Sequence, residues 1–164
     1  MRQTGARLID PKESGRRPLD LPSPVFDEDA VARADDALRA MSGSFQQWLE
    51  DEVGKLQTRR LAASAARWDD DSLEALMLAA HDLKGLGGTY DYPLVTQLAA
   101  SLCRLIDSDE GKAAVRAGPA LLTGHIDAIR AAVRDGIKTD KHPIGSTVLR
   151  TLEARVDALG LPRR

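Results

Sequence analysis

The feature that most constrains this chain is the helical spacing of its apolar residues. In one segment, Leu73, Leu76, Met77, Ala80 and Leu83 follow one another at intervals that place them on a single face of a helix. Similar stripes recur near residues 31–41, 45–56, 94–106, 122–133 and 148–159. No segment shows the credible apolar–polar alternation of a half-buried strand. We therefore expect an all-α fold.

Composition favours the packing of helices on helices. Apolar residues make up 43% of the 164 residues, but aromatic residues only 4%, whereas strands prefer β-branched and aromatic side chains. A chain of this length can form one domain with a single core. The helical segments and their short connections predict an antiparallel four-helix bundle with additional flanking N- and C-terminal helices. Pro93, well placed as the first residue of a helix, indicates a helix hairpin over about 72–107.

The expected limits of the domain come from breaks in this pattern. Residues 1–24 mix Pro, Gly, Arg and Ser without periodicity, which predicts a flexible N-terminal tail before a bundle domain over 25–160. Asp27 is expected to cap the first helix. The Ser-Gly-Ser sequence at 42–44 is expected to end that helix before another begins at Phe45.

Charge and cysteine content exclude several classes of function. The 23 basic and 25 acidic residues give a net charge of −2, so no overall charge attracts nucleic acid or an anionic membrane. The single Cys103 excludes an intramolecular disulfide and fits a reducing cytoplasm. With His125 and His142, which are expected at the surface or at helix caps, it shows no metal-ligand spacing. No membrane span or signal peptide is apparent, and we expect a cytoplasmic protein without a metal site.

The segment AAHDLKGLGGTYDYP brings an imidazole, a lysine and three glycines together at the end of one helix. On a helical wheel His81 lies about a quarter-turn from the centre of the apolar stripe, at the border between core and solvent. Lys84 follows one turn later, close enough for its amine to reach a group attached to the imidazole. Gly85 and Gly88 leave the same side of the helix without side chains.

This combination suits phosphoryl chemistry. A neutral imidazole is a competent nucleophile at cytoplasmic pH, and a lysine ammonium binds a phosphoryl group as a point charge. Phosphoryl transfer depends mainly on alignment and charge neutralisation, and a bare helix face lets a second protein approach the imidazole. The alternative is a surface or core histidine without a chemical role, which is the commoner case in a helix rich in Ala and Leu. The residues alone leave both interpretations open.

The sequence HDLKG, followed by LGGTYDYPLVTQLAASLCRLI, resembles the signature of histidine-containing phosphotransfer (HPt) domains over roughly residues 73–106. The resemblance implies a four-helix bundle with a solvent-facing phosphoacceptor, His81. It further implies that Lys84 stabilises the phosphate and that Gly85 clears room for a receiver domain. The chain departs from the family at Asp91, where many members have a glycine, but aspartate also tolerates turn conformations.

Two further residues are candidates for partner docking. Gly88 lies on the same side of the helix as His81, and Arg104 lies on the antiparallel helix, in a region that borders the phosphohistidine of the resembled fold. The resemblance implies that the partners are receiver domains of response regulators and of hybrid histidine kinases. No nucleic acid or membrane partner is expected.

The resemblance implies a histidine phosphotransfer protein that shuttles a phosphoryl group between receiver domains through a phosphohistidine. It would be a stoichiometric carrier and not an enzyme, because no part of the sequence resembles an ATP-binding domain. The sequence GLGG follows a helix and lacks the patterns of a nucleotide-binding loop. No cofactor is expected on this chain, since the Mg²⁺ that assists transfer would belong to the receiver. Two alternatives are a receiver-docking adaptor of the same fold that is not phosphorylated, and a helical dimerisation module.

Overall fold

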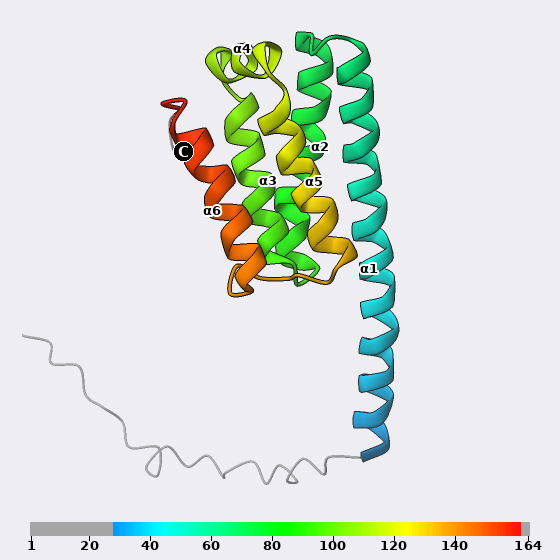
Figure 1. Ribbon diagram of the computed structural model, residues 1–164. Coiled ribbons are helices and arrows are strands. Elements are labelled where there is room, and N and C mark those ends of the chain that lie inside the picture. The colour runs from blue at the N-terminus through cyan, green and yellow to red at the C-terminus, as the bar shows by residue number, and fades with distance from the viewer. Residues whose placement is uncertain (1–27, 162–164) are drawn as a thin grey trace, which may run out of the picture. The chain divides into compact units, whose positions relative to one another are not determined.

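The computed structural model describes residues 28–161, apart from the side chains of residues 28 and 38–43 (Figure 1). Every regular element in this range is a helix, and six are present: α1 Glu28–Ala65, α2 Asp70–Thr89, α3 Pro93–Ile106, α4 Asp109–Ala117, α5 Ala120–Arg134 and α6 Pro143–Asp157. The predicted all-α fold is confirmed. No helix in the described range has both the length and the apolar character needed to cross a membrane.

The chain divides into two units, Met1–Ala37 and Leu38–Arg164. The expected tail over 1–24 and the expected cap at Asp27 lie outside the described residues, and the domain limits 25–160 stay a prediction. The predicted break at 42–44 is wrong, because α1 continues through it without interruption. One glycine costs a helix only about 1 kcal/mol relative to alanine, and its neighbours include the strong helix formers Ala, Leu, Arg and Met.

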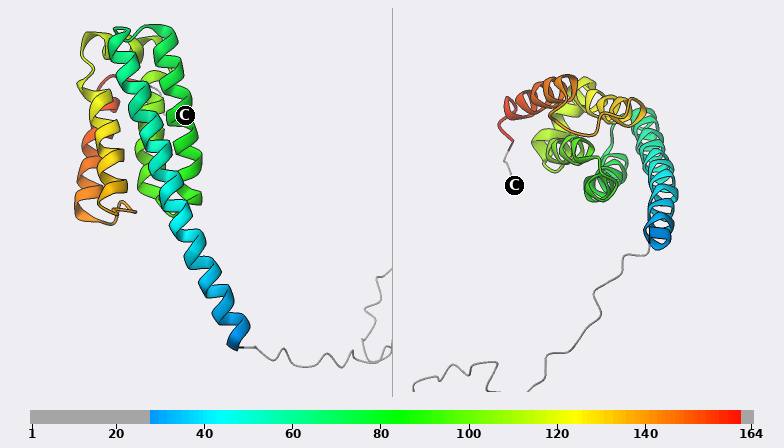
Figure 2. Two further views of the ribbon diagram at one scale, coloured as in Figure 1. Left: turned by 90° about the vertical axis from the view of Figure 1, so that its right-hand side faces the viewer. Right: turned by 90° about the horizontal axis from the view of Figure 1, so that it is seen from below.

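Within the second unit, α2 and α5 run antiparallel to α3 and to the part of α1 from residue 38 onward (Figures 1 and 2). This part of α1 lies beside α2 and α5, α3 packs against α2 and α5, and α6 covers α3 and α5. The predicted apolar stripes from residue 45 onward meet in one core, whose fully buried side chains include Leu49, Leu56, Leu73, Leu76, Leu83, Leu98, Leu102, Leu105, Leu122, Ile126 and Ile129. In the first predicted stripe, at 31–41, Val31 and Ala34 are exposed, so the prediction is wrong at these two positions. The arrangement is a four-helix bundle with α6 added on one side.

The short helix α4 between α3 and α5 was not expected from the apolar pattern. Ser108 caps its N-terminus, with its hydroxyl oxygen accepting a hydrogen bond from the Gly111 backbone nitrogen at 3.1 Å. Asp109 and Glu110 occupy the first turn, where acidic side chains stabilise the helix dipole. The sequence Ser-Asp-Glu at 108–110 is thus the signal that could have revealed this helix, which is too short to show a stripe.

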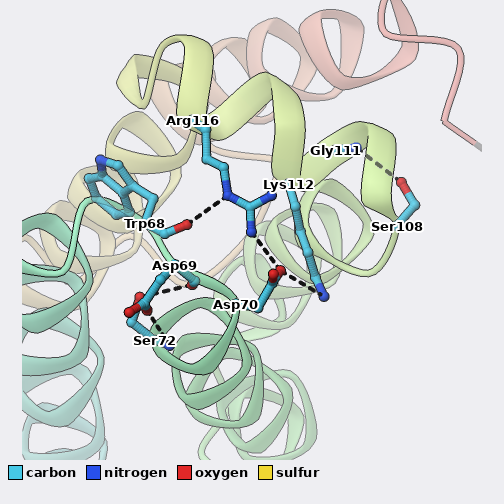
Figure 3. Close-up of polar contacts among 8 residues, drawn as sticks. All are labelled: Trp68, Asp69, Asp70, Ser72, Ser108, Gly111, Lys112 and Arg116. Carbon is cyan, nitrogen blue, oxygen red and sulfur yellow. Dashed lines mark hydrogen bonds and ion pairs between the residues drawn. The ribbon is translucent and has the colours of Figure 1, made fainter.

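Helix α4 fixes the N-terminus of α2 (Figure 3). Arg116 donates from Nε to the carbonyl oxygen of Trp68 at 3.0 Å and forms an ion pair with Asp70 at 2.5 Å. Lys112 lies 3.8 Å from the same carboxylate. Trp68 itself adopts a left-handed φ of 61°, so the connection between α1 and α2 turns sharply at this point. These contacts join α4 to the start of α2, which Asp69 caps by accepting a hydrogen bond from Ser72 N at 2.9 Å.

Candidate functional site

Helix α2 presents His81 and Lys84 one turn apart on its solvent-facing side. Both side chains are exposed, whereas their neighbours Ala80 and Leu83 are fully buried in the core. The imidazole therefore lies at the edge of the core, as the spacing of the apolar residues predicted. A partner molecule can reach it without any movement of the bundle.

A cleft of about 380 Å³ lies beside His81, between α2, α3 and α6. Its lining includes Met77, His81 and Lys84 from α2, Gln97, Ala100, Ser101, Cys103 and Arg104 from α3, and Glu153 from α6, with Asp107 and Ser108 at the end of α3. Lys84 and Arg104 bring positive charge to this cleft, and Asp107 and Glu153 bring negative charge. The structure thus brings three predicted site residues, His81, Lys84 and Arg104, to one place.

Gly85 and Gly88 leave an open surface next to the imidazole. Both are exposed, and a Cβ added at Gly85 would meet no other atom within 4 Å. A Cβ at Gly88 would come no closer than 4.0 Å to Thr96 Oγ1. Packing within the described structure therefore requires neither glycine, and Gly85 also lines a shallow depression together with His81 and Asp82.

Gly87 has a different role, which the sequence reasoning missed. It is buried, and an added Cβ would lie 2.6 Å from Thr96 Oγ1, 2.8 Å from Thr96 N and 3.0 Å from Tyr92 O. The missing side chain lets the end of α2 approach the start of α3 closely. Its place one turn after Leu83, on the apolar stripe, was the signal that separated it from Gly85 and Gly88.

Asp91 lies in the turn between the two hairpin helices, α2 and α3. Asp91 adopts a left-handed φ of 60°, a conformation that aspartate tolerates better than most residues. Lys138 donates to its carboxylate at 2.9 Å, and this contact raises the pKa of Lys138. The next residue, Tyr92, is buried and donates from its hydroxyl to Gln46 of α1 at 2.9 Å. The expectation that Asp91 preserves the hairpin is confirmed.

Arg104 lines the cleft but is held by α6. Its Nη2 donates to Asp157 Oδ1 at 2.6 Å, and its side chain is only 16% exposed. Its Nε is buried and has no hydrogen-bond partner within the described part of the chain. The side chain predicted to touch a partner is thus mostly covered, and its role in docking stays a prediction.

The expectation that His125 lies at the surface or at a cap is wrong, because its side chain is completely buried. Its Nδ1 lies 2.8 Å from the Leu121 carbonyl oxygen and its Nε2 lies 2.9 Å from Ser101 Oγ. Burial lowers the pKa of His125, so the ring is neutral. A carbonyl can only accept, which assigns the proton to Nδ1 and makes Nε2 the acceptor for the Ser101 hydroxyl.

The position of His125 could have been read from the sequence, since it follows Leu122 by one turn on the inward stripe of α5. Its two hydrogen bonds satisfy both ring nitrogens, which marks it as a structural residue. His142, by contrast, is exposed and occupies the position directly before α6, as expected. Of the three histidines, His81 and His142 are accessible.

The fold and the site together define a class of protein: a helical bundle with an accessible histidine on a helix hairpin, followed by a lysine and an open glycine. The model of the Hpt domain matches residues 40–134, more than half of the chain, and the protein belongs to the Hpt domain family. Membership indicates a phosphocarrier module of two-component signalling that interacts with receiver domains in phosphorelays. Comparisons with curated proteins and with solved structures gave no match.

Proposed function

We propose that this protein is a histidine phosphotransfer protein in which His81 carries a phosphoryl group between receiver domains, from a hybrid histidine kinase to a response regulator. The observation that carries this proposal is the exposed imidazole of His81, with Lys84 one turn along α2 and an open surface at Gly85. A nucleophile that must meet an aspartyl phosphate inside another protein has to be accessible, and His125 is not.

The transfer itself needs few groups. An imidazole nitrogen of His81 attacks the phosphorus of the receiver's aspartyl phosphate with its lone pair, and an N–P bond forms. The P–O bond to the aspartate breaks, and the carboxylate leaves with the bonding electrons, while the proton on the other ring nitrogen stays on the ring. The reverse sequence on a second receiver regenerates the neutral imidazole. Alignment of the two proteins supplies most of the rate.

The neighbouring residues of α2 have supporting roles in this proposal. The Lys84 ammonium neutralises charge on the phosphoryl group, both on His81 and during transfer. Gly85 and Gly88 leave room for the receiver to bring its aspartate to the imidazole. The carrier needs no cofactor of its own, because the Mg²⁺ that assists transfer is expected on the receiver. We expect this exchange to take place in the cytoplasm.

Two other functions are outcomes of the test below. A bundle of this fold can dock receivers without accepting a phosphoryl group, or can serve as a dimerisation module. The combination of His81, Lys84 and Gly85 favours the carrier, because neither alternative requires an exposed imidazole beside a lysine.

The experiment is incubation of the protein with a phosphorylated receiver domain carrying labelled phosphate. Phosphohistidine is expected to give label that survives base and is lost in acid. His81→Gln should accept no label while retaining the helical content and melting temperature of the wild type. His142→Gln is the matched control, since it changes another exposed histidine, and should be labelled normally. Label retained by His81→Gln would overturn the assignment, and receiver binding without any labelling would favour the adaptor.

A further inference from the structure

The connection between α1 and α2 holds two residues other than glycine in the left-handed region. Arg67 has a φ of 55° and Trp68 a φ of 61°. Positive φ is uncommon outside glycine, and for a bulky residue such as tryptophan it is an outlier. Left-handed backbone brings Cβ too close to the following carbonyl oxygen, so each residue raises the free energy of the folded chain. The sharp turn from α1 into α2 is therefore a strained segment.

The hydrogen bonds at the end of α1 show how the strain arises. Trp68 N donates to Ala63 O at 2.7 Å, and Arg67 N donates to Ser64 O at 3.2 Å. This is the Schellman arrangement, in which the left-handed position is usually glycine, but here it is Arg67. A straight helix through the connection would relieve both residues. Residues 61–66 are mostly alanine, the strongest helix former, and favour such a continuation.

Helix α1 contacts the rest of the bundle through a narrow apolar stripe. Its described side chains that are buried are Leu49, Val53, Leu56 and Ala63. A groove of about 680 Å³ lies on one side of this stripe, between α1 and α5, and a groove of about 860 Å³ lies on the other, between α1 and α2. Gly54 lines both grooves, and a Cβ there would meet no atom within 4 Å. The contact that holds α1 is thus small compared with the length of the helix.

We propose that two copies of this chain exchange α1. In the exchanged dimer, residues 66–69 straighten, α1 and α2 become one helix, and α1 packs on the second copy. A second copy fits α1 because it repeats the surface on which α1 packs here, and a short strained connection favours such an exchange. Both copies lose the strain at Arg67 and Trp68, while the contacts of Leu49 and Leu56 are remade between the copies.

Other contacts favour the closed chain (Figure 3). Trp68 O accepts a hydrogen bond from Arg116 Nε at 3.0 Å, and Asp69 caps α2 by accepting from Ser72 N at 2.9 Å. A straight connection gives up the cap, and association costs translational and rotational freedom. Because the dimer forms by mass action, the balance between these terms depends on protein concentration. We therefore expect a monomer at low concentration and the exchanged dimer at high concentration.

The exchange changes which chain supplies the surface beside His81. The shallow depression there is lined by His81, Asp82 and Gly85 of α2 and by Glu52 of α1. In the exchanged dimer Glu52 comes from the second copy, so a partner docking at either histidine meets residues of two chains. His81 lies about 18 Å along α2 from Asp69, so straightening the connection leaves the imidazole exposed. The inference goes beyond the proposed function and does not depend on it, because it concerns assembly and not phosphorylation.

The test begins with the mass of the full chain. The protein is unfolded in urea so that α1 separates, refolded at low and at high concentration, and measured by light scattering after size-exclusion chromatography. We expect a monomer after dilute refolding and a dimer after concentrated refolding. A monomer at every concentration would overturn the proposal.

A cross-link shows whether the dimer is exchanged. Thr58 of α1 and Leu78 of α2 are exposed and line the same groove, so a short bismaleimide can join cysteines in the double variant Thr58→Cys, Leu78→Cys. In the exchanged dimer each link joins two chains, and a denaturing gel shows a covalent dimer. In a dimer formed by surface contact the links stay within one chain, the gel shows a monomer, and the proposal is overturned. Burial raises the pKa of Cys103 to about 11, and Thr58→Cys alone controls for its reaction.

Glycine at residue 67 tests the cause of the exchange. Arg67→Gly relieves the closed chain and weakens a straight helix, so the dissociation constant of the dimer should rise on the order of tenfold or more. Ala66→Gly is the matched control. Ala66 N already bonds to Ala62 O at 2.9 Å as in a helix, so glycine there affects the closed and the straight connection alike, and the dissociation constant should change little. Equal dissociation constants for the two variants would overturn strain as the cause.

Discussion

Gly87 of α2 lies so close to Thr96 of α3 that a Cβ added to the glycine would be 2.6 Å from Thr96 Oγ1 and 2.8 Å from the Thr96 backbone nitrogen. These distances are shorter than any that a real side-chain carbon adopts, so the two helices can cross at this point only because residue 87 is glycine. The crossing sets how closely α3 approaches α2. The same approach sets how far the α3 residues that line the cleft lie from His81.

The first prediction is that Gly87→Ala destabilises the protein. Alanine favours a helix over glycine by about 1 kcal/mol, but the added methyl group meets backbone atoms, which cannot rotate away. Overpacking of this kind costs about 1–3 kcal/mol, of which the helix propensity of alanine offsets about 1 kcal/mol, so we expect a net loss of up to about 2 kcal/mol in the free energy of unfolding measured with urea. Gly85→Ala is the matched control and should be neutral or more stable. Equal stability of Gly87→Ala and the wild type would show that the helices separate at little cost.

The second prediction concerns docking at Gly85. A Cβ at this position meets no atom of the protein within 4 Å, so Gly85→Gln should leave stability unchanged or raise it by up to about 1 kcal/mol. The long side chain should nevertheless keep a receiver from aligning its aspartate with His81, and we expect transfer to slow on the order of tenfold or more. Single-turnover transfer from a phosphorylated receiver measures this effect. An unchanged rate would mean that the open surface is not used for docking.

The third prediction concerns the charge of Lys84. Since this side chain is exposed and packs against little, Lys84→Ala should change the free energy of unfolding by no more than about 0.5 kcal/mol. Loss of the ammonium should slow phosphoryl transfer to His81 on the order of tenfold or more and shorten the life of the phosphohistidine. Lys84→Arg should restore only part of the rate, because a planar guanidinium does not replace a compact ammonium. Equal rates for wild type and Lys84→Ala would remove Lys84 from the site.

The fourth prediction is a pH dependence of stability that originates at His125. Burial lowers the pKa of this histidine in the folded protein, whereas the unfolded chain protonates it below its usual value of about 6.5. Its contribution to stability is therefore complete above about pH 6.5 and is lost as the pH falls below that value, with a slope of at most about 1.4 kcal/mol per pH unit.

Urea unfolding at about pH 7.5 and about pH 5.5 measures this slope. His125→Gln should be less stable at the higher pH, because the hydrogen bonds to Ser101 and Leu121 are disturbed, but its stability should fall less on acidification. His142→Gln, which changes an exposed histidine, should keep the wild-type slope. An identical slope in wild type and His125→Gln would place the acid sensitivity elsewhere in the protein.

The helix hairpin could be predicted closely because local signals define it. The apolar stripe and Pro93 indicated a hairpin over about 72–107, and the structure has its helices at Asp70–Thr89 and Pro93–Ile106. The exposure of His81 followed from its angle to the stripe. These features depend on residues within a few turns of one another, which is the range over which periodicity is informative.

Other features depend on small free-energy differences or on contacts between residues far apart in the sequence, and the sequence did not reveal them. The Ser-Gly-Ser sequence at 42–44 weakens a helix without ending it, and α4 was too short to show a stripe. The bond between Arg104 and Asp157 joins residues 53 positions apart. Nothing local to either residue distinguishes it from an ordinary exposed charge, so only the packing of α6 on α3 shows their pairing.

The short turn between α2 and α3 also bears on the order in which the protein folds. Residues 90–92 connect the two helices, and Tyr92 N donates back to Gly87 O at 2.7 Å across the turn. Contacts between residues close in sequence cost little loop-closure entropy and form early. The contact that ties α1 to this turn, from Tyr92 to Gln46, instead spans 46 positions. We therefore expect the hairpin that bears His81 to act as a folding nucleus onto which α1 docks late, so the surface offered to a partner takes shape before the bundle is closed.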